Sequence, residues 1–274
     1  FLREMAEIEV NFGMWMLYGV PASLLMAPVA WGVLMLFFKP EMSHLKKSKA
    51  DLQKEFEELP PMHREEIITL ILFLFTVILW LTSPFLKKLL GIAIPISMPV
   101  LFTSCLFFIP GVSKTGWKKI EPQISWSGII LIVSGISVGM MLYTSGAARW
   151  LSVILLSKIG SLPPFLMVFV IVFIISMLKI IFSSNTVTAT IIIPIMIELA
   201  VSLGLPVLSV ALPASLVASL AFILVTSSPT NVIPYSAGYF SIADFASSGV
   251  VMTLFGSVIL SSVVYVIGLG TGIY

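Results

Sequence analysis

The stretch Ser183-Ser184-Asn185-Thr186 decides how this sequence is interpreted, because it separates two apolar segments, 163–182 and 187–203. Consecutive small polar residues are costly in hydrocarbon, where an unpaired polar group loses its hydration without compensation. Such a break is tolerated where it lines a cavity or a ligand site. The stretch therefore predicts a site that the surrounding apolar segments carry into a membrane.

The composition indicates a membrane protein. Of the 274 residues, 58% are hydrophobic and 10% are charged, whereas a soluble domain carries roughly 25% charged residues. The formal net charge of +2 gives no indication of a nucleic-acid partner, and a single cysteine excludes a disulfide framework. We expect an all-α polytopic protein, multi-pass in the cell membrane and surrounded by the lipid bilayer. The chain begins at Phe1 without a signal peptide, and we expect it to be a piece of a longer protein.

Polar and apolar runs predict four regions. A flanking helix and an apolar span occupy 1–38, and 39–66 form the one long polar segment. Further spans and an interfacial helix follow in 67–160, where Gly135 and Gly139 form a small-xxx-small face for close helix packing. The remaining region, 161–274, carries the polar breaks.

The polar segment 39–66 predicts an amphipathic helix on the membrane surface. Its apolar residues recur at helical spacing among lysines and acidic residues: Leu45, Leu52, Phe56 and Leu59. Because short loops rich in Lys and Arg stay on the cytoplasmic side, we expect this linker to be cytoplasmic.

A second polar run, 226–231, interrupts the apolar segment that starts at Leu208. The chain continues past it with Tyr235 and Tyr239 rather than with a charged loop, which favours a break within the membrane. The first break admits two interpretations. It can be a turn between two full crossings, since Ser and Asn are ordinary turn residues. Pro194 and Glu198 in the second arm favour a re-entrant hairpin instead.

Both breaks suit ion chemistry. Hydroxyl, amide and freed carbonyl oxygens suit a hard cation such as Na⁺, and N–H groups at the start of a following half-helix suit an anion. Discontinuous helices of this kind mark substrate and ion sites in secondary transporters. The two breaks therefore predict transport of an anion together with a cation.

Lys179 lies one helical turn before Ser183, about 6 Å away along a helix axis. A lysine at mid-membrane depth indicates a function, since burying its charge is expensive. It would counter a substrate carboxylate or stand in for a bound cation. The alternative is a lysine that snorkels to the membrane surface from an interfacial turn.

Three runs resemble the signatures of the divalent anion/sodium symporter family. These are 184–190 with the following Ile-Ile-Ile-Pro194, then Ser228-Pro229-Thr230-Asn231-Val-Ile, and Ile124-Ser125-Trp126 before the preceding span. Their order and spacing are similar to the C-terminal half of such a transporter. In that family the usual residues are Thr where Ser228 stands and Pro where Thr230 stands.

The resemblance implies the second inverted repeat of an elevator-type transporter, preceded by the last helix of the first repeat in 1–38. It implies a re-entrant helical hairpin in 161–203, a broken helix in 206–248 and a last span in 249–272. Family members are usually dimers, so we expect a homodimer. The chain would also need the N-terminal repeat, which supplies the rest of the site.

The resemblance also assigns site residues. The substrate carboxylate would lie between the hairpin and the broken helix, at Ser184, Asn185, Thr186, Ser228, Pro229 and Thr230. Oxygens for one Na⁺ would come from Ser183, Asn185 and Ser227, and Lys179 is the possible charge partner.

We therefore expect secondary active transport of di- or tricarboxylates of the succinate, malate and citrate class, coupled to Na⁺, and no enzymatic activity. A Na⁺-independent dicarboxylate exchanger is the rival that Lys179 supports, and it would need no Na⁺. Sulfate is a further candidate substrate. A membrane scaffold fragment without transport is the alternative from another class, and the two polar breaks count against it.

Overall fold

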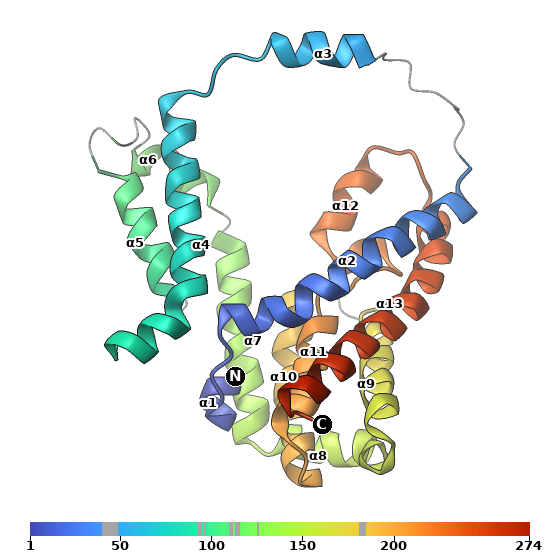
Figure 1. Ribbon diagram of the computed structural model, residues 1–274. Coiled ribbons are helices and arrows are strands. Elements are labelled where there is room, and N and C mark those ends of the chain that lie inside the picture. Colours follow the sequence, from blue (N-terminus) through green and yellow to red (C-terminus); the bar gives the residue numbers. More distant parts are fainter. Residues whose placement is uncertain are drawn as a thin grey trace. The chain divides into compact units, whose positions relative to one another are not determined.

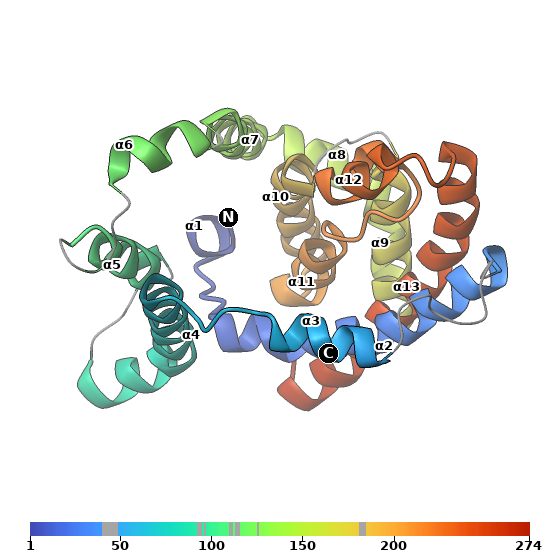
Figure 2. The same ribbon diagram turned by 90° about the horizontal axis from the view of Figure 1, so that it is seen from above.

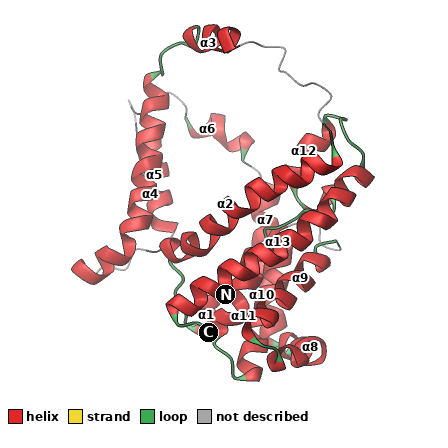
Figure 3. Ribbon diagram, turned by 45° about the vertical axis from the view of Figure 1, so that its right-hand side comes forward, coloured by secondary structure: helices red, strands yellow, loops and turns green. Residues whose placement is uncertain are grey.

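A computed structural model describes residues 1–39, 49–91, 95, 97–109, 112, 116–124, 126–180 and 185–274 (Figure 1). Every regular element in these residues is a helix, as Figure 3 shows, which confirms the predicted all-α class. The chain forms two compact units. The first comprises 1–10, 16–38 and 126–274, and the second comprises 11–15 and 39–125.

Several helices are long and apolar enough to cross a membrane. They are α2 (Phe12–Phe37), the Arg64–Leu86 part of α4 (Arg64–Leu90), α10 (Asn185–Leu203) and α13 (Ile242–Thr271). This confirms the prediction of a multi-pass membrane protein.

The second unit contains the linker and two packed apolar helices. Its elements after α2 are α3 (Lys49–Glu57), α4, α5 (Ser97–Phe107), α6 (Trp117–Ile120) and the 3₁₀ turn η1 (Glu121–Gln123). Helices α4 and α5 pack against each other. Between them, the buried Thr76 hydroxyl donates to the Thr103 hydroxyl at 2.9 Å. In the linker, Leu52 and Phe56 lie one turn apart on α3 and are both exposed, as an amphipathic helix requires. Leu45 lies outside the described residues.

The first unit carries the elements of the predicted transport region. In chain order its further elements are α1 (Leu2–Ala6), α7 (Trp126–Thr144), α8 (Ala147–Leu156), η2 (Ser157–Ser161), α9 (Pro164–Leu178), α10, α11 (Val207–Val217), η3 (Val225–Ser227), α12 (Pro229–Ser236) and α13. Helix α11 packs against both α9 and α10, and α13 packs against α9, as Figure 1 and Figure 2 show. The fully buried side chains Ile175, Ile197, Leu212 and Val264 form the core of this contact.

Helix α7 packs closely on α10 through its glycine face. A Cβ atom on Gly135 would lie 2.9 Å from the Thr190 hydroxyl, and one on Gly139 would lie 2.5 Å from the Thr190 carbonyl oxygen. Such distances leave no room for a methyl group. The predicted packing role of Gly135 and Gly139 is therefore confirmed.

The apolar helices α9 and α11 of this unit are each too short to cross a membrane alone. Helix α9 has 15 residues and α11 has 11, so at 1.5 Å per residue they are about 22 and 16 Å long, against roughly 30 Å of hydrocarbon. Non-helical backbone follows α11, as the predicted second break requires.

The second break begins earlier than the sequence predicts. The predicted span continues to Val225, but α11 ends at Val217 and the chain is largely unwound from Ala218 to Ser228 before α12 starts. The unwound backbone packs closely on α13: a Cβ atom on Gly249 would lie 1.9 Å from the Phe222 carbonyl oxygen. Hydropathy does not indicate such a contact, so the sequence predicts that the apolar residues 220–225 continue the helix.

Candidate functional site

Helix ends from both interrupted segments meet at Lys179. This residue caps the end of α9, and its ammonium Nζ donates to the Asn185 Oδ1 at the start of α10 and to the Ala218 carbonyl oxygen at 2.5 Å. The Ser227 hydroxyl returns to the first segment and donates to the Lys179 carbonyl oxygen at 3.0 Å. One lysine thus joins the end of α9, the start of α10, the end of α11 and the turn before α12.

Lys179 is buried, with 2% of its surface exposed. A lysine that snorkels would instead place its ammonium in water or at the headgroups. The snorkelling interpretation of the sequence is therefore wrong. Among the described residues, the ammonium donates to two neutral oxygens, one from a carboxamide and one from a peptide.

Carbonyl groups at the ends of α9 and α11 each accept a hydrogen bond from a residue of the other segment. The last carbonyl groups of a helix have no partner within it, and they lie at the negative end of the helix dipole. The Lys179 ammonium binds such a carbonyl at the end of α11, and the Ser227 hydroxyl binds one at the end of α9. The positive charge of the ammonium therefore lies at the C-terminal end of α11, where the helix dipole favours it.

The start of α12 lies directly after this junction. Ser228 precedes the helix with extended backbone, at φ −155° and ψ 141°, and is 3% exposed. Its hydroxyl lies 2.8 Å from the Thr230 hydroxyl in the first turn. Helix N-terminal ends favour anions, and two of them, those of α10 and α12, begin close to the Lys179 network.

Two residues of the site have roles that the sequence did not reveal. The Asn231 side chain donates to the carbonyl oxygens of Ala221 at 2.7 Å and Leu224 at 3.3 Å, so it holds the unwound segment in place. Ala218 contributes only its backbone carbonyl. Every residue has a backbone carbonyl, so the sequence could not single out Ala218. An Asn beside a helix break, in contrast, is a recognisable donor for free carbonyl groups.

The structure brings some predicted site residues together and does not describe others. Asn185 and Ser227 both contact Lys179, and Ser228 pairs with Thr230. Thr186 is half-buried in the first turn of α10, and Pro229 is the first residue of α12. Ser183 and Ser184 lie outside the described residues.

Among the described residues, no group of three or more His, Cys, Asp and Glu side chains could hold a metal ion. A cation at this junction would therefore have neutral oxygens as ligands. Two of the three oxygens predicted for Na⁺ are already engaged: Asn185 Oδ1 accepts from the Lys179 ammonium, and the Ser227 hydroxyl donates to the Lys179 carbonyl.

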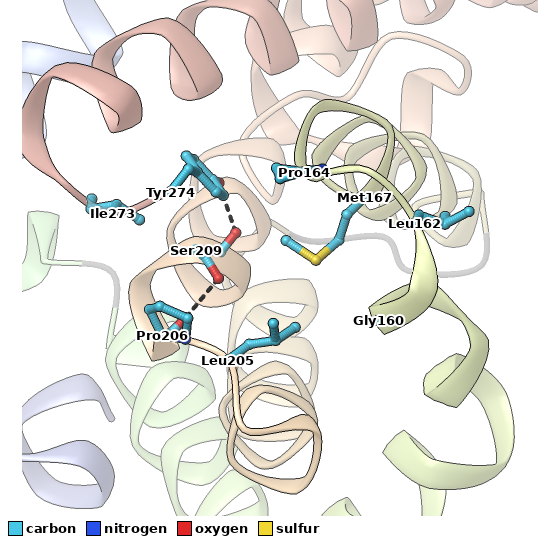
Figure 4. A pocket seen from close by; sticks show the side chains of 9 residues that line it. All are labelled: Gly160, Leu162, Pro164, Met167, Leu205, Pro206, Ser209, Ile273 and Tyr274. Atoms are coloured by element: carbon cyan, nitrogen blue, oxygen red, sulfur yellow. Dashed lines mark hydrogen bonds between the residues drawn. The ribbon is translucent and has the colours of Figure 1, made fainter.

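A cavity of about 180 Å³ lies elsewhere in the same unit (Figure 4). The Tyr274 hydroxyl donates to the Ser209 carbonyl oxygen beside it at 2.8 Å, and burial raises the pKa of this hydroxyl. The lining of the cavity is largely apolar: Gly160, Leu162, Pro164, Met167, Leu205, Pro206, Ser209, Ile273 and Tyr274. None of the predicted site residues lines it.

Comparisons with known proteins identify relatives among membrane transporters. The sequence model of a family described as "Sodium:sulfate symporter transmembrane region" matches residues 1–270. The sodium-dependent dicarboxylate transporter SdcS of Staphylococcus saprophyticus is 30% identical over 266 residues, which cover 94% of this chain and 51% of the relative. SdcS of Staphylococcus aureus strain MRSA252 is 28% identical over 268 residues, with the same coverage. The chain spans about half the length of the curated relatives it matches.

Proposed function

This chain belongs to the sodium:sulfate symporter family of divalent anion/sodium symporters, and from this premise we propose that it is the C-terminal half of a Na⁺-coupled transporter of di- or tricarboxylates. The two SdcS relatives are named as sodium-dependent dicarboxylate transporters. Family and relatives are transporters and not enzymes, so the proposal concerns transport alone.

The observation that carries the proposal is the junction at Lys179. Two interrupted helices meet there through the contacts of Lys179 with Asn185, Ala218 and Ser227. A scaffold without transport has no use for a buried ammonium and unwound backbone at such a place, because both are costly in a membrane. In a transporter, ion binding at this place would offset that free-energy cost.

The anion would bind where α10 and α12 begin. Because Asn185 Oδ1 accepts from Lys179, the amide NH₂ is the part of Asn185 that can donate to a carboxylate. Backbone N–H groups and hydroxyls at the two helix starts would add further donors. This assigns the substrate role to Ser184, Asn185, Thr186, Ser228, Pro229 and Thr230.

We propose an elevator movement in which 161–203 and 206–248 travel as one body. The interlocked ends of the two segments support this, since the Lys179 and Ser227 contacts would have to break if the segments moved apart. The N-terminal repeat would complete the site, and a homodimer would carry it in the membrane.

One rival function has an observation in its favour. A buried lysine supplies a positive charge without an ion gradient, as a Na⁺-independent dicarboxylate exchanger would need. The two functions differ in what drives uptake, which can be measured directly.

The test is uptake of labelled succinate and citrate by the full-length parent protein in liposomes. We expect uptake under an inward Na⁺ gradient and little uptake when choline replaces Na⁺. Asn185→Ala should reduce the rate at least about tenfold, because a charged group would lose a hydrogen bond of 1.5–3 kcal/mol. Ser202→Ala, at the far end of α10, is the matched control and should transport normally.

Obligate exchange with internal dicarboxylate, without Na⁺, would contradict the Na⁺-coupled proposal in favour of the exchanger. Uptake of sulfate in place of succinate would change the substrate class. An intact, folded parent that transports no divalent anion would favour the scaffold.

A further inference from the structure

We propose that the short helix α6, which follows the α4–α5 pair, binds the headgroup of an anionic phospholipid. Its residues are Trp117-Lys118-Lys119-Ile120. The tryptophan would lie at the edge of the hydrocarbon, and the two lysines would bind the lipid phosphate. This inference goes beyond the proposed function and does not depend on what the protein transports.

An aromatic contact attaches α6 to the end of α5. The Trp117 ring meets the Phe108 ring, which directly follows α5, with 5.8 Å between the ring centroids and 68° between the ring planes. Such an edge-to-face pair is a favourable geometry for aromatic rings. The contact therefore places the two lysines that follow Trp117 beside an apolar helix.

The apolar side chains around this contact are left exposed. Trp117 is 49% exposed, Phe108 38% and Ile109 46%. Tryptophan is enriched where the hydrocarbon meets the headgroups, because its ring is apolar and its N–H group is polar. These exposed side chains therefore suit the boundary of a bilayer better than they suit water.

The pairing of α4 with α5 supports this depth for the contact. Figure 1 shows α6 at the end of the pair where α4 begins. Because Thr76 hydrogen-bonds to Thr103, these two residues lie at one level of the pair. At 1.5 Å per residue, Ile67, the first apolar residue of α4, lies about 14 Å from that level and Phe108 about 8 Å from it. Phe108 thus lies within about 6 Å of the level at which α4 becomes apolar.

The two lysines supply charge that is not paired within the described part of the chain. Lys118 and Lys119 are exposed, and neither ammonium has a hydrogen bond or an ion pair with another described residue. The sequence 106–125 contains three lysines and one acidic residue, Glu121. Basic residues beside a membrane helix attract the anionic lipids of the cytoplasmic leaflet, and we expect the linker at the same end of α4 to be on that side. The phosphate of an anionic lipid is therefore the complementary partner.

The test measures lipid binding to the purified full-length parent protein. Native mass spectrometry in detergent, with phosphatidylglycerol or phosphatidylcholine added in steps, gives the dissociation constant of each bound lipid. We expect the double variant Lys118→Gln/Lys119→Gln to bind one phosphatidylglycerol at least about tenfold more weakly than the wild type, with phosphatidylcholine binding unchanged. Replacing both lysines with arginine keeps the charge and should keep the binding.

A charge-matched control removes two other exposed lysines. The double variant Lys88→Gln/Lys158→Gln loses the same net charge and should keep the tightly bound phosphatidylglycerol. Trp117→Ala tests the aromatic part of the site, because it keeps both lysines but removes the ring contact. We expect it to weaken phosphatidylglycerol binding about fivefold, and Trp117→Tyr should restore most of the affinity.

Wild-type phosphatidylglycerol binding in the Lys118→Gln/Lys119→Gln variant would overturn the inference. The lysines would then face water, an acidic protein segment or a second copy of the chain. An equal loss in the Lys88→Gln/Lys158→Gln control would also overturn it, since any exposed lysine would then serve. The substituted lysines are exposed, so we expect all of these variants to fold, and none of the outcomes depends on uptake.

Discussion

At the residue scale, the site depends on side chains that cap backbone groups. Lys179 and Ser227 cap helix ends, and Asn231 caps the carbonyls of the unwound segment. Each buried carbonyl in a membrane needs a partner, because water is absent there. If the proposed site is right, the side chains that hold the break lie next to the bound anion.

Asn231→Ala tests this capping role. The substitution leaves the carbonyls of Ala221 and Leu224 without their donor, and we expect a loss of about 1–3 kcal/mol in stability. Thermal unfolding of the detergent-solubilised parent measures the effect as a lower Tm. Ser247→Ala, at an exposed position on α13, should leave the Tm unchanged. Equal Tm values for both variants would show that Asn231 does not hold the segment.

At the element scale, α13 is the surface on which the break rests. Gly249 admits the Phe222 backbone, and one side of the Phe222 ring faces Gly256, where a Cβ atom would lie 3.2 Å from it. The unwound segment can therefore approach the helix axis more closely than any side chain would allow. An apolar sequence and a glycine-containing helix together produce a break that neither indicates alone.

Gly249→Ala tests this contact. The added methyl would overlap the Phe222 carbonyl, so we expect a loss of at least about 3 kcal/mol together with loss of uptake. Gly270→Ala on the same helix is the matched control, since a Cβ atom there meets nothing within 4 Å; it should be neutral or slightly stabilising. Wild-type Tm and uptake in Gly249→Ala would mean that the segment does not lie against α13.

The sequence predicted the elements well because hydropathy and helix length are properties of single segments. It predicted α10 to within two residues and the end of α2 to within one, and the binding roles of Asn185, Ser227 and Ser228 stay predictions. It could not predict the end of α11 at Val217, because the unwound segment that follows packs on Gly249 through the Phe222 backbone, a contact between distant parts of the chain. Nor could it decide the environment of Lys179, which depends on the Ala218 carbonyl far along the chain.

At the scale of the whole molecule, the proposed function would make this chain one half of a transporter. Its two units differ in content: 126–274 with α2 hold both interrupted helices, and 39–125 hold the linker and the α4–α5 pair. The division into a moving part, 161–274, and a stationary part, 67–160, stays a prediction, as do the homodimer and the need for an N-terminal repeat.

The central claim is that a divalent anion binds between the hairpin and the broken helix. Equilibrium binding of labelled succinate to the purified parent in Na⁺ tests it most directly, with one variant from each segment, Asn185→Ala and Ser228→Ala. We predict that each weakens binding at least about tenfold, while Ser262→Ala at a half-buried position of α13 does not. Wild-type affinity in either site variant would contradict the claim.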